Sequence, residues 1–80
     1  MYLIGDIGNT DIKICLFNKN LKLIKKIRIK TNLLSKNYIY KNLKFIKNYK
    51  VQIKKILFSS VVPSAFKKIK KFIDNSTKVK

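Results

Sequence analysis

The residues best suited to chemistry lie in one short segment near the N-terminus, between two apolar runs. The segment consists of Asp6, Ile7, Gly8, Asn9, Thr10, Asp11, Ile12 and Lys13. Gly8 allows the backbone to approach a ligand closely, because it has no Cβ. Asn9 and Thr10 supply side-chain donors, and Lys13 supplies a positive charge. Asp6 stands at a strand end, where its carboxylate can hold a metal ion. Together these groups suit the phosphates and magnesium of a nucleotide, although the same residue types also form ordinary hairpin turns.

Three strands are expected to position this segment. Tyr2–Ile7 is mostly apolar, as in a buried central strand, and residues 12–17 alternate with period two. A turn at 18–20, made of polar residues that tolerate positive φ, leads to a third alternating run over 21–30. That alternation breaks at Ile24-Lys25, which indicates a β-bulge. The sequence therefore predicts an antiparallel meander whose first turn carries the reactive segment.

The second half of the chain predicts a helix, a fourth strand and another helix. After a connection at 31–34, Ser35 is the expected N-cap of a helix over 36–50. Its core-facing positions at helical spacing are Tyr38, Ile39, Leu43, Phe45, Ile46, Tyr49 and Lys50. A short strand rich in Ile, Leu and Phe follows at 53–59, and residues 60–63 form a loop.

The last predicted element is a helix that starts at Pro63-Ser64, with Ser64 as its N-cap. Its inward positions are Ala65, Phe66, Ile69, Phe72 and Ile73. Residues 75–80 are expected to fray. The order β-β-β-α-β-α matches the first part of a ribonuclease-H-like (actin-like ATPase) α/β domain, in which the fourth strand runs parallel to the first. The fourth strand would then be an unprotected sheet edge, so poor stability or aggregation is expected.

Composition limits the function classes. The 80 residues make one domain at most, and 20 basic residues against three acids give a formal charge of +17. That charge fits a nucleic-acid or anionic-membrane binder, but Lys, Ile and Asn make up half the chain, which also fits an AT-rich genome. Salt-sensitive polyanion binding is expected in either case. No His is present and Cys15 is alone, which excludes a disulfide framework and a Cys/His zinc site. A reducing, cytoplasmic setting fits, with no signal peptide and no membrane span.

Three motifs together resemble the N-terminal part of type III pantothenate kinases, which belong to the actin/Hsp70/sugar-kinase superfold. The first is the Asp6-Ile7-Gly8-Asn9-Thr10 loop with Lys13. The second is Ser59-Ser60-Val61-Val62-Pro63 after the fourth strand, and the third is Arg28-Ile29-Lys30-Thr31. Their spacing fits the family over nearly the whole chain. The combination is more specific than the Asp-x-Gly-x-Thr loop alone, which many phosphate-binding hairpins share.

This resemblance implies an ATP-binding transferase that phosphorylates pantothenate to 4'-phosphopantothenate, the first step of coenzyme A biosynthesis. Asp6 to Lys13 would be the ATP-binding loop, with Asp6 holding or orienting magnesium. Ser59 and Ser60 would line the cleft. The complete enzyme would use potassium or ammonium and form a homodimer. Residues 1–80 would be the N-terminal part of a single kinase domain whose C-terminal remainder is absent.

The chain departs from the family in ways that bear on activity. Asp11 lies inside the loop, where a second carboxylate near phosphates is unfavourable unless it faces solvent or the metal. The family's downstream Gly-x-Asp-Arg element, which brings the catalytic Asp, is missing, and no acid lies between Asp11 and Asp74. No catalytic residue is therefore assigned, and the 80 residues alone are expected to be inactive.

Two other functions stay open at the level of sequence. A small basic nucleic-acid-binding module would use the lysines with Tyr38, Tyr40, Phe45 and Tyr49 for charge and stacking, although their helical spacing also fits core positions. Another phosphate-binding member of the superfold, such as a sugar kinase or ATPase, is compatible with the loop but not favoured by the Ser-Ser-Val-Val-Pro element.

Overall fold

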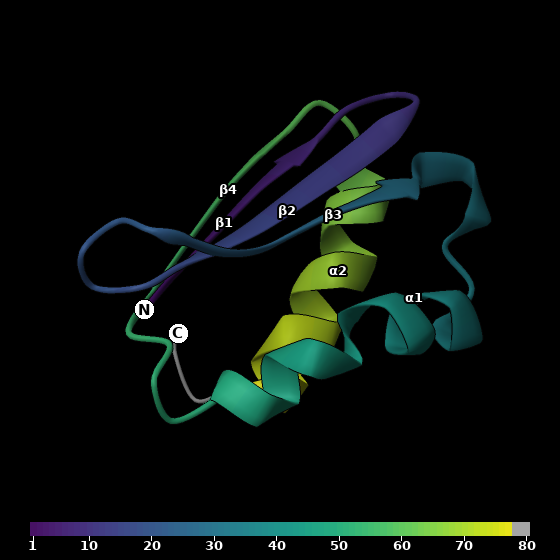
Figure 1. Cartoon of the computed structure of the whole chain (residues 1–80). Helices are drawn as coiled ribbons and strands as arrows, with labels where there is room; N and C mark the ends of the chain where they lie inside the picture. Colours follow the sequence, from purple (N-terminus) through teal and green to yellow (C-terminus); the bar gives the residue numbers. More distant parts are fainter. Residues whose placement is uncertain (78–80) are drawn as a thin grey trace.

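The computed structural model describes residues 1–77 as a four-stranded sheet with both α-helices on one side (Figure 1). The elements in chain order are β1 (Tyr2–Ile7), β2 (Asp11–Phe17), β3 (Leu23–Lys30), η1 (Thr31–Leu33), α1 (Lys36–Leu43), η2 (Lys44–Tyr49), β4 (Lys55–Ser60) and α2 (Pro63–Ser76), where η marks a 3₁₀ helix. The strands lie in the order β3-β2-β1-β4. Strands β1 to β3 are antiparallel neighbours, and β4 is parallel to β1. The predicted α/β fold class and the order β-β-β-α-β-α are confirmed.

The two hairpins follow the predicted register. The β1–β2 pairing ends at Ile7 and Ile12, so the reactive segment forms the first turn. Between β2 and β3 the register shifts at Leu16 and Phe17, which leaves Ile24 as the extra residue of a bulge. The predicted break of alternation is therefore confirmed.

The second turn departs from expectation in one respect, because its positive φ (63°) belongs to Leu21 and not to the polar residues before it. Asn18 explains this geometry. Its side-chain Oδ1 accepts hydrogen bonds from the backbone N–H groups of Asn20 and Lys22, both at 2.9 Å. These two bonds wrap the chain around Asn18 and impose the left-handed conformation on the residue between the two donors.

The core lies between the sheet and the helices. On β1, Leu3, Gly5 and Ile7 are buried toward the helices, while Ile4 and Asp6 are exposed on the other face. The expectation that β1 is buried on both faces is therefore wrong. The fully buried side chains of the core are Leu3, Ile7, Ile12, Ile14, Leu16, Leu43, Ile46, Ile53 and Ile69. We call the face of the sheet away from the helices the open face.

The first helix is shorter than predicted. Ser35 is its N-cap, and the Ser35 hydroxyl accepts a hydrogen bond from the Tyr38 N–H at 3.2 Å. The α-helical winding stops at Leu43, and the next six residues form the 3₁₀ helix η2. A 3₁₀ helix aligns side chains three residues apart, so Leu43 and Ile46 both face the core. Lys50, which was predicted to face the core, is exposed.

The end of the chain corrects three boundaries. The fourth strand is Lys55–Ser60 and not 53–59, and α2 begins at Pro63, whose missing N–H suits the first helical position. The predicted N-cap at Ser64 is wrong, because Val62 occupies the cap without a side-chain bond. Helix α2 also continues through Ser76, where fraying was predicted. The rest of that prediction, residues 78–80, lies outside the described residues.

Strand β4 is an edge of the sheet, as predicted, and Leu57 on it is 66% exposed. An apolar hollow of about 280 Å³ lies between this strand and α2, lined in part by Ile56, Phe58 and Phe66. Within residues 1–77, no helix is long and apolar enough to cross a membrane.

Candidate functional site

The reactive segment forms a tight turn at one end of the sheet. The Gly8 N–H donates to the Asp11 carbonyl at 2.9 Å, and Asn9 and Thr10 at the tip are exposed. A Cβ at Gly8 would meet the Asp11 carbonyl oxygen at 3.2 Å and, apart from its chain neighbours, no other atom of the described residues within 4 Å. A ligand can therefore approach the backbone at Gly8 from the solvent side.

A row of polar side chains crosses the open face beside this turn. In register, Asp6 of β1 lies opposite Lys13 of β2 and Ser59 of β4, and Lys13 lies opposite Arg28 of β3. The Ser59 hydroxyl donates to Asp6 Oδ1 at 2.9 Å. Asp6 itself is exposed, so its carboxylate is held by β4 but stays accessible to a ligand. We call these four residues the polar row.

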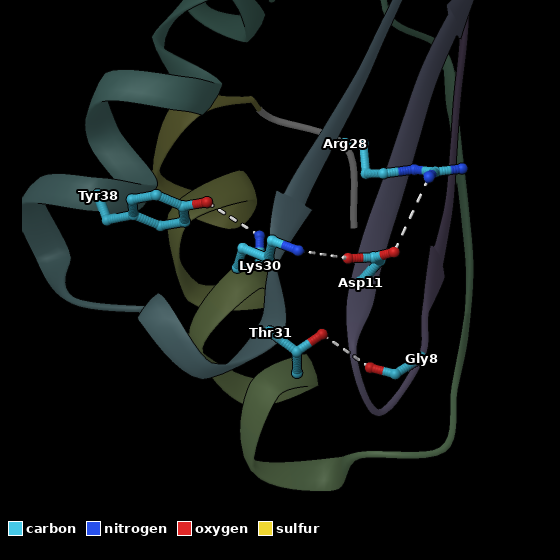
Figure 2. Close-up of polar contacts among 6 residues, drawn as sticks. All are labelled: Gly8, Asp11, Arg28, Lys30, Thr31 and Tyr38. Carbon is cyan, nitrogen blue, oxygen red and sulfur yellow. Dashed lines mark hydrogen bonds and ion pairs between the residues drawn. The ribbon is translucent and has the colours of Figure 1, made fainter.

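Asp11 faces two cations on β3 (Figure 2). Its carboxylate lies 3.9 Å from Arg28 Nη1 and 3.8 Å from Lys30 Nζ. Both distances exceed those of a hydrogen-bonded ion pair, and the two cations are more than half exposed. Oδ1 of Asp11 is buried and accepts no hydrogen bond within residues 1–77. The loop's second carboxylate is thus compensated by loosely held, partly solvated positive charge.

Thr31, the first residue after β3, contacts both ends of the turn. Its hydroxyl donates to the Gly8 carbonyl at 2.8 Å, and its backbone N–H donates to the Thr10 carbonyl at 3.0 Å (Figure 2 shows the first contact). The preceding Lys30 N–H donates to the Tyr38 hydroxyl at 2.9 Å, which ties the end of β3 to α1. The turn is therefore connected to the crossover helix through β3.

A shallow hollow of about 430 Å³ lies next to the turn. It is lined by Asn9, Thr10, Lys30, Asn32 and Leu33. Sequence reasoning did not single out Lys30 and Asn32 as site residues. Their signal was indirect: Lys30 ends β3 opposite Asp11, and Asn32 follows in η1, so both arrive at the loop end of the sheet. The hollow combines amide, hydroxyl and ammonium donors, which are groups that suit an anion.

The predicted segment divides into side chains that face solvent and side chains that support the fold. Ile7 and Ile12 are fully buried in the core, so they can contribute only backbone to a ligand site. Of the two serines at the end of β4, Ser59 belongs to the polar row. Ser60 instead accepts from the Val62 N–H at 3.1 Å and shapes the turn into α2. The assignment of Asp6 to Lys13 as an ATP-binding loop stays a prediction.

The acidic residues are few and separated. Residues 1–77 contain no group of three or more His, Cys, Asp or Glu side chains that could hold a metal ion. Asp6 nevertheless fits magnesium, which is often bound through one or two carboxylates together with substrate phosphates and water. Asp74 is a different case, since its Oδ2 lies 2.6 Å from Lys70 Nζ on α2.

The aromatic residues proposed for stacking are mostly engaged in the fold. Phe45 is buried, Tyr49 is half-buried, and the Tyr38 hydroxyl accepts the hydrogen bond from β3. Tyr40 alone among these four is largely exposed, at 51%, and Lys47 Nζ lies 5.1 Å from its ring centroid. A continuous stacking surface for single-stranded nucleic acid is therefore absent from these four residues.

The strand order β3-β2-β1-β4, the helical crossover to a parallel fourth strand and the turn at the tip of β1–β2 define an α/β protein of the ribonuclease-H-like, actin-like ATPase fold. A family model described as type III pantothenate kinase matches residues 2–80. A curated relative, the type III pantothenate kinase of Pelagibacter ubique (strain HTCC1062), is 38% identical over 80 residues, which is all of this chain. The chain belongs to the type III pantothenate kinase family, and it spans 32% of the length of that relative.

Proposed function

We propose that this chain forms the ATP-binding part of a kinase that phosphorylates the hydroxyl group of pantothenate to give 4'-phosphopantothenate. The observation that carries the proposal is the meeting of Asp6, Lys13 and the Gly8–Thr10 turn at one end of the sheet. Family membership supports the choice of substrates. It also favours this reaction over that of a sugar kinase or another ATPase of the same superfold.

The reaction requires that the phosphoryl group is positioned and that its negative charge is neutralised. Phosphoryl transfer spreads negative charge over the transferred group, and catalysis depends mainly on holding that group and stabilising its charge. Magnesium would supply positive charge to the phosphates, and Asp6 is the residue that would hold it. Ser59 fixes the Asp6 carboxylate from the neighbouring strand. Lys13, directly across from Asp6, offsets phosphate charge, and Lys30 beside the hollow adds a second cation that sequence reasoning missed.

The same residues support the expectation that the 80 residues alone are inactive as a kinase. Asp6 is assigned to the metal and Asp11 to the two cations of β3. Asp74 is eleven residues beyond the start of α2, about 16 Å along the helix at 1.5 Å per residue, and it is paired with Lys70. None of the three carboxylates is placed to accept a proton from a substrate hydroxyl. Robust pantothenate phosphorylation by the purified 80-mer would contradict this expectation.

We extend the proposal to the properties that the family resemblance implied. Residues 1–80 are the N-terminal part of a single kinase domain, and the working enzyme requires magnesium and a monovalent cation, potassium or ammonium. It acts as a homodimer in the cytoplasm. Dialysis against sodium salts, metal chelation and sedimentation of the native product test the monovalent cation, the magnesium and the homodimer separately.

The first experiment is the intact mass of the native product from its own cell, followed by an assay of that product with ATP, magnesium and pantothenate. Asp6→Asn is the test variant and Asp74→Asn is the matched control, because both remove one exposed carboxylate. Asp6→Asn should lower kcat/KM by at least about a hundredfold, as is usual when a group that stabilises transition-state charge is lost. Asp74→Asn should stay near the parent rate, since an exposed pair contributes little. Equal effects of the two variants would refute the assignment.

A second candidate function rests on one surface. The hollow between α1 and α2 is lined by Tyr40 and by several lysines, Lys36, Lys68 and Lys71 among them. Basic residues around an exposed ring can bind single-stranded nucleic acid. Titration with single-stranded DNA at two salt concentrations, with Tyr40→Ala beside the parent, separates a stacking site from bare charge. Binding that vanishes at moderate salt and ignores the substitution would leave only charge.

A further inference from the structure

Thr31 has no role in the phosphoryl transfer proposed above. It is half-buried beneath the turn, and it contacts the turn at both ends, through the hydroxyl and through the backbone N–H. In an ordinary tight hairpin the two residues that flank the tip exchange two backbone hydrogen bonds. Here only one of these is made within residues 1–77, from the Gly8 N–H to the Asp11 carbonyl. The Gly8 carbonyl, which would close the second bond, accepts from the Thr31 hydroxyl instead (Figure 2).

This replacement determines where two backbone donors point. A carbonyl and the N–H of the following residue share one rigid peptide plane and point in opposite directions. Because the Gly8 carbonyl is directed at the Thr31 hydroxyl, the Asn9 N–H is directed away from Thr31. Because the Thr10 carbonyl is directed at the Thr31 N–H, the Asp11 N–H is directed away from β3. One threonine thus fixes the orientation of two N–H groups of the turn.

Thr31 is itself well anchored. The preceding Lys30 N–H donates to the Tyr38 hydroxyl, and Tyr38 belongs to the first turn of α1 and packs against the core. The Lys30 ammonium also faces the Asp11 carboxylate at 3.8 Å. The contacts of Thr31 are therefore made from a fixed point of the fold, and loss of its hydroxyl would remove the hydrogen bond that directs the Gly8 carbonyl.

We propose that Thr31 is a positioning residue, which orients the Asn9 and Asp11 N–H groups toward the phosphate oxygens of the bound nucleotide. The inference rests on the proposed function for the ligand, but the orientation of the turn does not depend on it. Thr31 acts through the Gly8 and Thr10 carbonyls and makes no contact with the nucleotide itself.

The test uses the native-length protein with three variants. Thr31→Val removes the hydroxyl and keeps the shape, and Thr31→Ser restores the hydroxyl. Thr77→Val is the matched control, because the Thr77 hydroxyl also donates to a carbonyl, that of Ile73, at 3.0 Å near the end of α2. The ¹⁵N order parameters of Asn9 and Asp11 are measured without ligand, and affinity is measured with magnesium and a non-hydrolysable ATP analogue.

Thr31→Val should lower the order parameters of the turn. It should also weaken binding of the ATP analogue by about three- to tenfold, the usual effect of one lost hydrogen bond. Thr31→Ser should recover both, and Thr77→Val should change neither. Unchanged order in Thr31→Val, failure of the serine variant, or an equal loss in Thr77→Val would overturn the inference. If the parent protein binds no ATP analogue, the proposed function fails, whereas the order parameters still decide whether Thr31 orients the turn.

Discussion

The contact between Gly5 and Phe58 gives the sharpest prediction for stability. These residues face each other across the parallel pair β1–β4, on the side of the sheet that carries the helices. A Cβ built on Gly5 would overlap the Phe58 ring at three of its atoms. The Gly5→Ala variant therefore has to displace that ring, although a methyl group is the smallest possible addition.

The magnitude follows from two opposing effects. Overpacking a buried contact costs about 1–3 kcal/mol, and the hollow that Phe58 lines beside α2 gives its ring room to yield. Replacing glycine by alanine also restricts the unfolded chain, which stabilises the fold by about 0.4–1 kcal/mol. The expected net loss is about 1–2 kcal/mol. In a domain of this size, each 1 kcal/mol lowers Tm by about 4–8 °C.

Urea unfolding of a double-mutant cycle measures the contact directly. Phe58→Leu removes the ring, so Gly5→Ala should be neutral or stabilising in that background. The coupling between the two substitutions should then be about 1–3 kcal/mol, within the range of residues in direct contact. If Gly5→Ala costs the same in both backgrounds, the overlap is not the reason why glycine is needed at this position.

Two further predictions concern the turns. Leu21→Asn should raise Tm by about 4–8 °C, because a left-handed backbone costs leucine roughly 1–2 kcal/mol and asparagine less. Leu33→Asn is the control in the same melting experiment, because Leu33 is also exposed but has no positive φ. A drop for Leu21→Asn would mean that its apolar contacts outweigh the strain. Asp11→Asn should tighten ATP-analogue binding by about two- to fivefold at low salt, since it removes a negative charge beside the proposed phosphate site, and the gain should shrink at higher salt. Weaker binding in titration calorimetry would show that the Asp11 carboxylate takes part in holding the ligand.

The sequence predicted what depends on local patterns. Period-two alternation located the meander, its interruption located the bulge at Ile24, and the N-cap role of Ser35 followed from its hydroxyl. Boundaries were less certain where two local preferences competed. At the start of α2, Ser64 suits the cap position and Pro63 suits the first helical position, and the helix begins at Pro63. At the end of α1, the winding changes from α-helical to 3₁₀, and the periodicity of apolar residues cannot distinguish the two over six residues.

The candidate site was named from residues that are consecutive in the chain, and its role stays a prediction. The contacts between strands at this site were not predicted. The bond from Ser59 to Asp6 joins residues 53 apart in the chain, and that from Thr31 to Gly8 joins residues 23 apart. Both depend on the register of paired strands, which sets opposite neighbours only once the sheet is assembled. Lys30 was overlooked as a site residue for the same reason, since it reaches the hollow by pairing with Asp11.

The backbone conformation of the β1–β2 turn shows whether its geometry requires particular residue types. Neither Gly8 nor Asn9 nor Thr10 has a positive φ, so the chain turns here in conformations that every ordinary amino acid adopts. Asparagine at the tip is therefore not required by backbone geometry, in contrast to Leu21, which tolerates a conformation that suits it poorly. Side chains at the tip are free to be selected for what they bind. Variants such as Asn9→Ala consequently report on ligand chemistry without the cost of a left-handed backbone in the result.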